Sequence, residues 1–337
     1  MIFAAMQDGT RLGLGGAPLG NLFRTVSDTD ALALVAHAWR DGCRTFDTAP
    51  HYGNGLSEHR IGTALRQHPR AELVLSSKVG RLLEPDAAAP PDQNSYVAVL
   101  PFRQRWDYSA AGVRRSVEDS LQRLGLARLD VAFIHDCDAA THGAGHDRVR
   151  AQVIAETIPA LNALKSTGLV SHIGLGVNDV AICLDVLRAT TIDCLLLAGR
   201  YSLIDHTALD ELLPLAAARG TRIALGGVFN SGILATGVRN AGAEIRFNYA
   251  RADRHWIERV AAIEAICADE AVPLRAAALQ FPLAHPAIEI LLAGAQTIGE
   301  WDDTRAMLRH PIGAGFWQRL RAEGLLPPAA PVPEAAA

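Results

Sequence analysis

Short apolar segments alternate with longer amphipathic segments along the whole of this 337-residue chain. Such alternation is typical of a parallel β-sheet whose strands are connected by helices. Eight strand-helix units are enough to close the sheet on itself, so the pattern predicts an α/β fold, the (β/α)8 TIM barrel. We expect its strands at residues 12–15, 45–47, 73–78, 131–135, 172–177, 194–197, 221–225 and 289–293.

The chain is longer than such a barrel requires. About 250 residues are typical, so the surplus must lie in loops and at the end of the chain. We expect extended loops over the carboxyl-end face at residues 80–108, 136–150 and 226–254. Residues 1–326 contain no linker-like stretch and are expected to form a single domain, while the Pro- and Ala-rich residues 327–337 are expected to form a flexible tail.

Composition excludes several classes of protein. The formal net charge is −4, and no long basic tract is present, which argues against a nucleic-acid partner. The five cysteines form no CxxC pair, which argues against a disulfide framework or structural zinc and favours a cytoplasmic protein. No apolar run approaches the roughly 20 residues that cross a bilayer, and we expect neither a signal peptide nor a membrane span. The sequence leaves the oligomeric state unknown.

Polar residues follow the carboxyl ends of several predicted strands, where barrels of this kind build their active sites. Asp47 ends the second strand, Lys78 the third and His135 the fourth, and Asn178 follows the fifth. Buried parallel strands are normally apolar, so ionisable side chains at their ends are costly unless they are paired or used. Taken singly, each residue also has a structural explanation, such as an internal salt bridge between Asp47 and Lys78.

The segment 46–53, together with Ser57-Glu58, Ser77-Lys78 and Ile134-His135, closely resembles the aldo-keto reductase family. The resemblance covers nearly the whole chain. It implies a catalytic set of four residues, namely Asp47, Tyr52, Lys78 and His135.

These four residue types suit hydride transfer, which requires a proton to move to or from the oxygen on the reacting carbon. Tyr52 is expected to move that proton. Because an ordinary tyrosine pKa of about 10 is too high for efficient exchange at neutral pH, we expect Lys78, kept charged by Asp47, to lower it. His135 is expected to hydrogen-bond the substrate oxygen.

A nicotinamide dinucleotide is the cofactor that the resemblance implies, extended across the barrel mouth. The glycine-rich opening is not a Rossmann fingerprint, because Pro18 stands where the third glycine should be. Three positions depart from the family's usual nicotinamide contacts. Val177 replaces the usual serine before Asn178, and Ala198 stands where a glutamine often helps to hold the carboxamide. Gly226 or Gly227 replaces the usual stacking tyrosine. The implied cofactor-binding residues are Gly16, Ala17, Asp47, Asn178, Phe229, Asn230, Ser231, Gly232, Gly294, Ala295, Gln296, Thr297 and Glu300.

Glu300 bears on the choice between NAD and NADP. Members of the family that prefer NADPH carry a basic residue at this position. A carboxylate there would repel the 2′-phosphate of NADP and could accept a hydrogen bond from the free 2′-hydroxyl of NAD. The alternative explanation is an ordinary acidic residue in the first turn of a helix. We expect NAD as the preferred cofactor, with NADP still possible.

Further motifs at residues 13–20, 78–81, 201–203 and 229–232 resemble the branch of the family that contains aldose and pyridoxal dehydrogenases. The leading hypothesis is therefore oxidation of an aldose of the L-fucose, D-arabinose or L-galactose type at its anomeric carbon, giving a lactone. Expected substrate contacts are Tyr52, His135, His51, Trp106 and Asp136.

Three alternatives stay open. The same machinery, run with NADPH, would make the protein a carbonyl or pyridoxal reductase or dehydrogenase. The family also contains potassium-channel β-subunits, so a cofactor-binding regulatory subunit is the alternative of another class. A barrel aldolase would use Lys78 as a Schiff-base lysine, which the nearby Asp47 opposes.

Two further features are not expected to carry chemistry. His142 and His146 are separated by two glycines and an alanine, which makes a stable helical metal-binding pair improbable, so we expect no metal site. Cys137 adjoins Asp136, but no feature of the sequence indicates a lowered thiol pKa.

Overall fold

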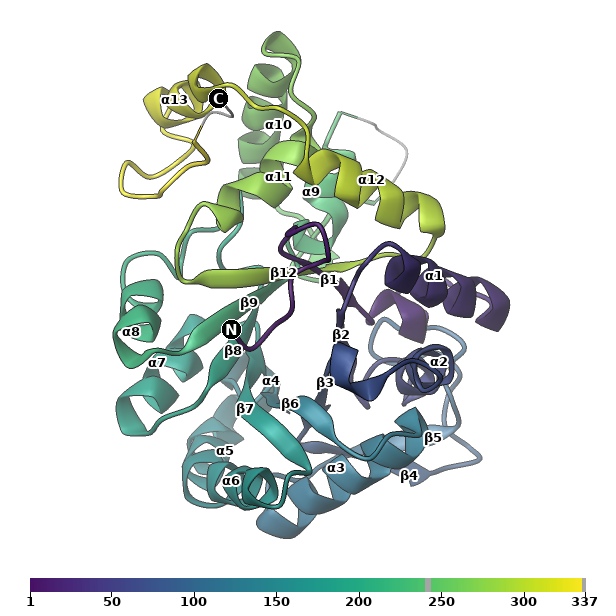
Figure 1. The fold of residues 1–337 in the computed structure, drawn as a ribbon. Helices are drawn as coiled ribbons and strands as arrows, with labels where there is room; N and C mark the ends of the chain where they lie inside the picture. The colour runs from purple at the N-terminus through teal and green to yellow at the C-terminus, as the bar shows by residue number, and fades with distance from the viewer. Residues whose placement is uncertain (240–243, 335–337) are drawn as a thin grey trace.

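A closed barrel of eight parallel strands forms the centre of the computed structural model, which describes residues 1–239 and 244–334 (Figure 1). Around the barrel the strands follow the order β1-β12-β9-β8-β7-β6-β3-β2. All eight predicted strands are present, with ends that differ from the predictions by two residues or fewer. The predicted fold class is confirmed.

The barrel strands are β1 (Leu12–Gly15), β2 (Thr45–Asp47), β3 (Val74–Val79), β6 (Leu129–His135), β7 (Val170–Val177), β8 (Cys194–Ala198), β9 (Arg222–Gly226) and β12 (Ile288–Gly294). Helices surround them, as Figure 1 shows. The longer helices are α1 (Asp28–Arg40), α2 (Leu56–Leu65), α3 (Ala110–Leu124), α6 (Ile158–Ser166), α7 (Val180–Ala189), α8 (Leu212–Arg219), α10 (Arg254–Asp269), α11 (Leu274–Leu283), α12 (Ile298–Leu308) and α13 (Ala314–Ala322).

Helix ends follow the punctuation of the sequence. The Ser27 side chain accepts a hydrogen bond from the Asp30 backbone N–H at the start of α1, and Ser109 caps α3 in the same way. Gly125 and Gly220 adopt left-handed backbone conformations just after α3 and α8. Such caps satisfy backbone groups that a helix end leaves unpaired, which is why these residues predicted the boundaries.

The amino end of the barrel is closed by the start of the chain. The backbone N–H groups of Ile2 and Phe3 donate to the Glu289 carboxylate at 2.6 and 2.9 Å. The Phe3 ring is buried in the barrel interior in one cluster with Phe133 and Leu292. Access to the barrel is therefore from the carboxyl ends of the strands.

The three predicted loops follow β3, β6 and β9 and contain structure of their own. The first forms an antiparallel hairpin, β4 (Arg81–Pro85) with β5 (Phe102–Trp106), and the second contains the short helices α4 (Ala139–His142) and α5 (His146–Gln152). The third holds α9 (Ile233–Thr236) and a small hairpin, β10 (Arg246–Phe247) with β11 (Ala250–Arg251), and part of it lies outside the described residues.

Residues 327–334, within the predicted tail, include a buried Ala330 whose carbonyl accepts a hydrogen bond from Arg321. Residues 335–337 of that prediction lie outside the described part of the chain. All five cysteines are free thiols and are buried. Among the helices of the described residues, none has the length and apolar character needed to cross a membrane.

Gly80 joins β3 to the β4–β5 hairpin under a steric constraint. Its φ is +107°, and an added Cβ would stand 2.5 Å from a ring carbon of Tyr108. The Tyr108 hydroxyl in turn donates to the backbone carbonyl of His135 at 2.7 Å. The missing side chain at Gly80 therefore lets Tyr108 connect the first loop to the end of β6.

We predict that Gly80→Ala lowers the free energy of unfolding by about 2–4 kcal/mol, because an unfavourable φ and an overpacked contact act together. Gly168→Ala is the matched control, since Gly168 has a φ of +79° but no atom within 4 Å of the added Cβ. Urea unfolding of both variants measures the difference. Equal decreases in the free energy of unfolding of the two variants would show that the contact with Tyr108 makes no contribution to the loss.

Candidate active site

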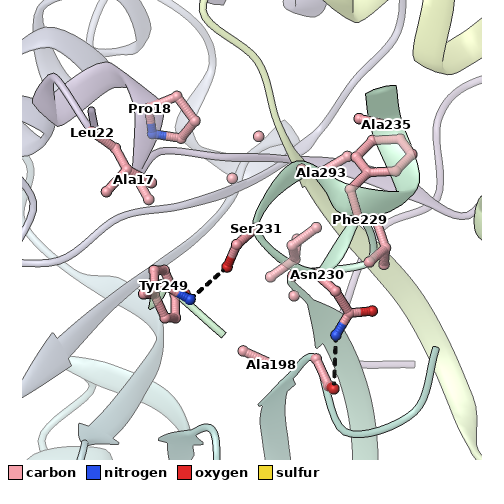
Figure 2. A pocket seen from close by; sticks show the side chains of 18 of the residues that line it. Ala17, Pro18, Leu22, Ala198, Phe229, Asn230, Ser231, Ala235, Tyr249 and Ala293 are labelled. Carbon is pink, nitrogen blue, oxygen red and sulfur yellow. Dashed lines mark hydrogen bonds between the residues drawn. The ribbon is translucent and has the colours of Figure 1, made fainter. Parts of the chain in front are cut away.

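Two connected hollows open at the carboxyl ends of the barrel strands. The first, of about 320 Å³, is a groove between Ala17, Pro18 and Leu22 on one side and the segment 229–232 on the other (Figure 2). The second, of about 380 Å³, is a cavity next to it. Both are lined by Tyr52, Asn178 and Tyr249, so these residues lie where the groove and the cavity meet.

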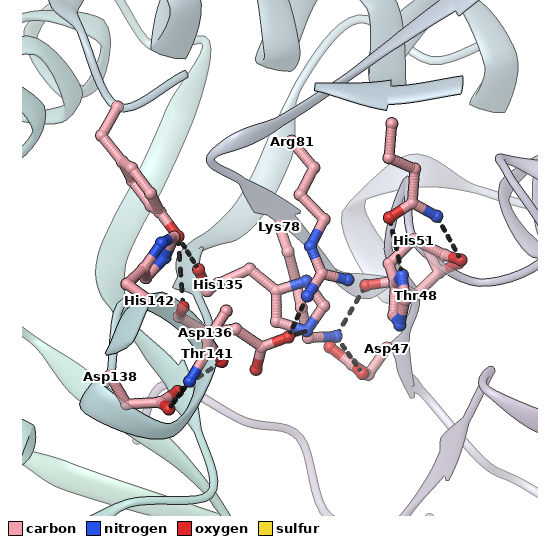
Figure 3. Close-up of polar contacts among 12 residues, drawn as sticks. Asp47, Thr48, His51, Lys78, Arg81, His135, Asp136, Asp138, Thr141 and His142 are labelled. Carbon is pink, nitrogen blue, oxygen red and sulfur yellow. Dashed lines mark hydrogen bonds and ion pairs between the residues drawn. The ribbon is translucent and has the colours of Figure 1, made fainter. Parts of the chain in front are cut away.

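A buried ion pair lies at the base of the cavity. Lys78 Nζ donates to Asp47 Oδ2 at 2.7 Å and to the Thr48 carbonyl at 2.8 Å (Figure 3). Ser76 Oγ donates to the other carboxylate oxygen of Asp47 at 2.6 Å. Asp47 and Lys78 come together because they end neighbouring strands of the barrel, with Asp47 directly opposite Ser76 in register.

Tyr52 and His135 complete the predicted set of four. Tyr52 lies in the turn after β2, and Lys78 Nζ is 4.5 Å from the centre of its ring. His135 ends β6, and its ring is 6.1 Å from that of Tyr52 at a nearly perpendicular angle. No hydrogen bond among the described residues uses a ring nitrogen of His135. The structure therefore brings the four predicted catalytic residues together at one site.

Burial has a larger effect than neighbouring charges on the pKa values of Tyr52, Lys78 and His135. It raises the pKa of Tyr52 well above 10.0, and the charge of Asp47 raises it further. Burial also lowers the pKa of Lys78, against the opposing effect of Asp47. The pKa of His135 falls well below 6.5 because of burial and the nearby charges of Arg81 and Lys78, so its imidazole is neutral.

The expectation that Lys78 brings the pKa of Tyr52 below its ordinary value is therefore wrong for the protein alone, because burial and Asp47 raise it. The cation of Lys78 lies over the ring face, and its charge is largely compensated by Asp47. Moving a phenolate out of water is unfavourable, and this effect prevails in the buried site. At neutral pH Tyr52 is a protonated phenol.

Polar side chains line much of the cavity around this set. His51 Nδ1 lies 2.9 Å from Gln104 Oε1, and burial together with the Arg81 charge lowers the pKa of His51 to about 3. A neutral His51 donates through Nδ1 to Gln104 and keeps Nε2 as an acceptor. The other polar residues of the cavity include Asn94, Ser95, Tyr96, Asp136, Asp138 and Thr141.

The groove contains most of the residues that were predicted to bind the cofactor. Gly226, Gly227 and Gly294 leave its walls without side chains, and its far end reaches the amino terminus of α12. Of the predicted cofactor residues, those that line the groove are Ala17, Asp47, Asn178, Phe229, Asn230, Ser231, Gly232, Gly294, Ala295, Gln296 and Glu300. Gly16 instead packs against the Asp47 carbonyl and Ser57, and the Thr297 side chain caps α12.

A sequence model of the Aldo/keto reductase family matches residues 11–323. The chain belongs to the aldo-keto reductase family. Members of this family use nicotinamide cofactors and act on small-molecule carbonyl substrates, so the protein is an oxidoreductase.

Two characterised relatives are dehydrogenases. A pyridoxal 4-dehydrogenase of Microbacterium luteolum is 42% identical over 327 residues, and a D-threo-aldose 1-dehydrogenase of Pseudomonas sp is 37% identical over 320 residues. Both alignments cover 94% of this chain and 94% of the relative. A holo aldo-keto reductase from Bacillus halodurans superposes with a TM-score of 0.71 at 22% identity, covering 96% of this chain and 94% of that one. This structural similarity shows the shared fold.

The predicted substrate contacts fall into two groups in this aldo-keto reductase. His51 and Asp136 line the cavity. Trp106 does not line it; this residue is 38% exposed, and its ring lies 4.1 Å from the guanidinium carbon of Arg81. Arg81 was part of a recognised motif, but the sequence did not indicate that its charge would face the site.

Tyr249 was not predicted as a site residue. It lies in the turn between β10 and β11, where its backbone N–H donates to Ser231 Oγ at 2.8 Å (Figure 2). This places an aromatic ring at the junction of groove and cavity, close to the part of the groove where Gly226 and Gly227 have none. A single tyrosine in an irregular loop offers no sequence pattern from which its position could be predicted.

Glu300 is not the free carboxylate that the sequence suggested. Its Oε1 is paired with Arg24 Nη2 at 2.5 Å, and its Oε2 accepts a hydrogen bond from the Gln296 backbone N–H at 2.7 Å. Arg24 therefore compensates part of the charge that was expected to repel the 2′-phosphate of NADP. The argument for NAD from Glu300 alone is correspondingly weaker.

We predict that Glu300→Arg raises the ratio of kcat/KM with NADP to kcat/KM with NAD by about tenfold, since two cations would then face the ribose end and solvent would screen them. Arg24→Ala should change the ratio in the opposite direction, because it leaves the Glu300 charge uncompensated. Steady-state kinetics with both cofactors measure the ratio. An unchanged ratio in both variants would mean that Glu300 acts only as a first-turn acid of α12.

Proposed function

We propose that the protein is an NAD(P)-dependent dehydrogenase that oxidises an aldose, in its cyclic hemiacetal form, at the anomeric carbon to a lactone. NAD is the proposed preferred cofactor. The observation that carries the proposal is the buried Lys78–Asp47 pair beside Tyr52 and His135, at one end of a groove suited to an extended dinucleotide. The similarity to a D-threo-aldose 1-dehydrogenase supports it.

A bound nicotinamide would accept the hydride from the anomeric carbon. In the same reaction Tyr52 Oη, after losing its own proton to solvent, takes the proton of the anomeric hydroxyl as a phenolate, and the C–O bond becomes a carbonyl. His135 is neutral, so its imidazole N–H donates a hydrogen bond to the same oxygen and holds it near Tyr52. In the reverse direction, the protonated Tyr52 is already in the form that donates to a carbonyl oxygen.

Lys78 stabilises negative charge on Tyr52 when the tyrosine must lose its proton for the next turnover. Its position is fixed by Asp47 and the Thr48 carbonyl. Because both charges are buried, removing either partner would leave an uncompensated charge. The ion pair also disfavours the aldolase alternative, since the Lys78 amine is already bound to a carboxylate.

Polar groups around the cavity favour a substrate with several hydroxyl groups. Asn94, Ser95, Asp136 and Thr141 offer both donors and acceptors. Oxidation of pyridoxal is the second candidate, supported by the 42% identical relative and by the aromatic faces of His51 and Tyr96, whose rings lie 5.2 Å apart. NADPH-dependent reduction of small aldehydes would use the same residues in reverse.

Steady-state oxidation of L-fucose, D-arabinose, L-galactose and pyridoxal, each with NAD and with NADP, tests the proposal. An aldose should give the highest kcat/KM, and mass spectrometry should identify the lactone. A highest value for pyridoxal would select the second candidate. No appearance of reduced cofactor with any of these compounds would favour a regulatory cofactor-binding role.

We predict that Tyr52→Phe lowers kcat by about 10³-fold or more while the Kd for cofactor stays within about twofold, because only the proton-transferring oxygen is removed. Tyr201→Phe is the matched control. Tyr201 is buried outside the two hollows and its hydroxyl has no hydrogen-bond partner among the described residues, so its removal should not affect kcat. Substantial activity in Tyr52→Phe would contradict the assigned role.

The raised pKa of Tyr52 predicts a pH dependence. Oxidation requires the phenolate, so its kcat/KM should rise with pH from about 6 to about 10, whereas reduction requires the phenol and should not rise in that range. In Lys78→Met the rise should move to higher pH, because the phenolate loses a neighbouring cation and Asp47 loses its partner. If kcat/KM for reduction rose with pH in parallel with kcat/KM for oxidation, this would argue against Tyr52 as the titrating group.

A further inference from the structure

A second buried ion pair borders the cavity, and the catalytic scheme above does not use it. Arg81 Nη2 lies 2.5 Å from Asp136 Oδ2, and the two side chains are only 8% and 21% exposed. Arg81 begins β4, while Asp136 directly follows His135 at the end of β6. Figure 3 shows the Asp136 carboxylate close to both the Arg81 guanidinium and the His135 ring.

The β4–β5 hairpin fixes Arg81 in this position. Trp106 is opposite Arg81 in the hairpin register, and its ring covers the guanidinium at 4.1 Å. Yet Nε and Nη1 of Arg81 are buried and have no hydrogen-bond partner among the described residues. A pair of apolar side chains would hold the hairpin against the barrel at no greater cost, so the charges point to a role beyond packing.

Asp136 is anchored through one oxygen only. Oδ2 contacts Arg81 and lies 3.5 Å from His135 Nε2, whereas no hydrogen bond among the described residues uses Oδ1. Burial raises the pKa of Asp136, and the charge of Arg81 acts against this rise. Asp136 therefore presents to the cavity a positioned acceptor, next to the group assigned to the reacting oxygen.

We infer that Asp136 recognises a hydroxyl group on the carbon next to the reacting carbon, so that the substrates are 2-hydroxy aldehydes and their cyclic hemiacetals. The inference rests on the proposed function, because it takes His135 as the residue that binds the reacting oxygen. Oxygens on adjacent carbons are close enough together to meet His135 and Asp136 at the same time.

The selectivity follows from the chemistry of the carboxylate. An ionised carboxylate only accepts hydrogen bonds, and a hydroxyl donating to it forms a stronger bond than a neutral pair does. A substrate without that hydroxyl would bury the carboxylate oxygen with no donor, and sites of this kind discriminate strongly against such analogues. Arg81 is a positioning residue that holds the carboxylate in place.

Two matched pairs of substrates test the inference on the wild-type protein. Lactaldehyde and propanal differ only in the hydroxyl next to the aldehyde, and L-galactose and 2-deoxy-L-galactose differ in the same way next to the anomeric carbon. We expect kcat/KM for reduction of lactaldehyde to exceed that for propanal by about 100-fold, and kcat/KM for oxidation of L-galactose to exceed that for 2-deoxy-L-galactose by about the same factor. Ratios within about threefold of unity in both pairs would overturn the inference.

Asp136→Asn shows whether this residue causes the selectivity. It keeps the shape of the side chain but removes the charge, and we expect the ratio within each pair to fall by about tenfold or more. Glu84→Gln is the matched control, because Glu84 lies in the β4–β5 hairpin that carries Arg81, and it pairs with Arg103 and Arg105 and does not line the cavity. It should leave the ratios unchanged.

Three outcomes separate the inference from the function on which it rests. An Asp136→Asn variant that loses activity equally on both members of each pair would assign Asp136 a structural role and overturn the inference. Equal turnover of both members of each pair by the wild type would also overturn the inference, but it would leave the proposed oxidoreductase reaction intact. No turnover of either pair with either cofactor would overturn the proposed function and the inference together. Thermal unfolding checks that the variants fold, and the wild-type ratios remain decisive if one does not.

Discussion

The ion pair of Lys78 and Asp47 is the interaction on which the site depends. Two opposite charges are held out of water at the end of β2 and β3, and they are acceptable there only because Ser76 and the Thr48 carbonyl complete their hydrogen bonds. Breaking such a pair from one side typically costs about 3–5 kcal/mol, so the surrounding structure cannot move without a penalty. The closed barrel supplies that rigidity, and Tyr52 and His135 are placed against it.

In the proposed mechanism, catalysis uses residues at or just after the ends of β2, β3 and β6, and the loops supply further residues around them. The loop after β3 brings Arg81 to Asp136, which lines the cavity at the end of β6, and the loop after β9 brings Tyr249 to the edge of the cavity. Burial, together with the nearby charges of Arg81 and Lys78, lowers the pKa of His135 and keeps its imidazole neutral. In the proposed function, His135 therefore serves one reaction while the residues around it determine which substrate fits.

The sequence predicted the barrel well because each buried strand is a short apolar run, and it predicted Asp47, Lys78 and His135 as neighbours because parallel strands end at one edge. It could not show how deeply Tyr52 is buried, and so the direction of its pKa shift was wrong. Nor could it reveal that Arg24 neutralises Glu300, since those residues are far apart in the chain. Trp106 was expected in the pocket, but its ring packs on the guanidinium of Arg81, its partner across the hairpin, and the sequence does not show this pairing.

The closure of the barrel joins segments from the two ends of the chain. β1 lies between β2 and β12, and the Ile2 and Phe3 amides are held by Glu289 on β12. During synthesis on the ribosome, one edge of β1 must therefore wait unpaired until nearly the whole polypeptide has emerged. Long-range pairing of this kind is slow, and an open strand edge is prone to aggregation. High-level expression of this protein should consequently benefit from lower temperature or from chaperones that shield the unfinished sheet.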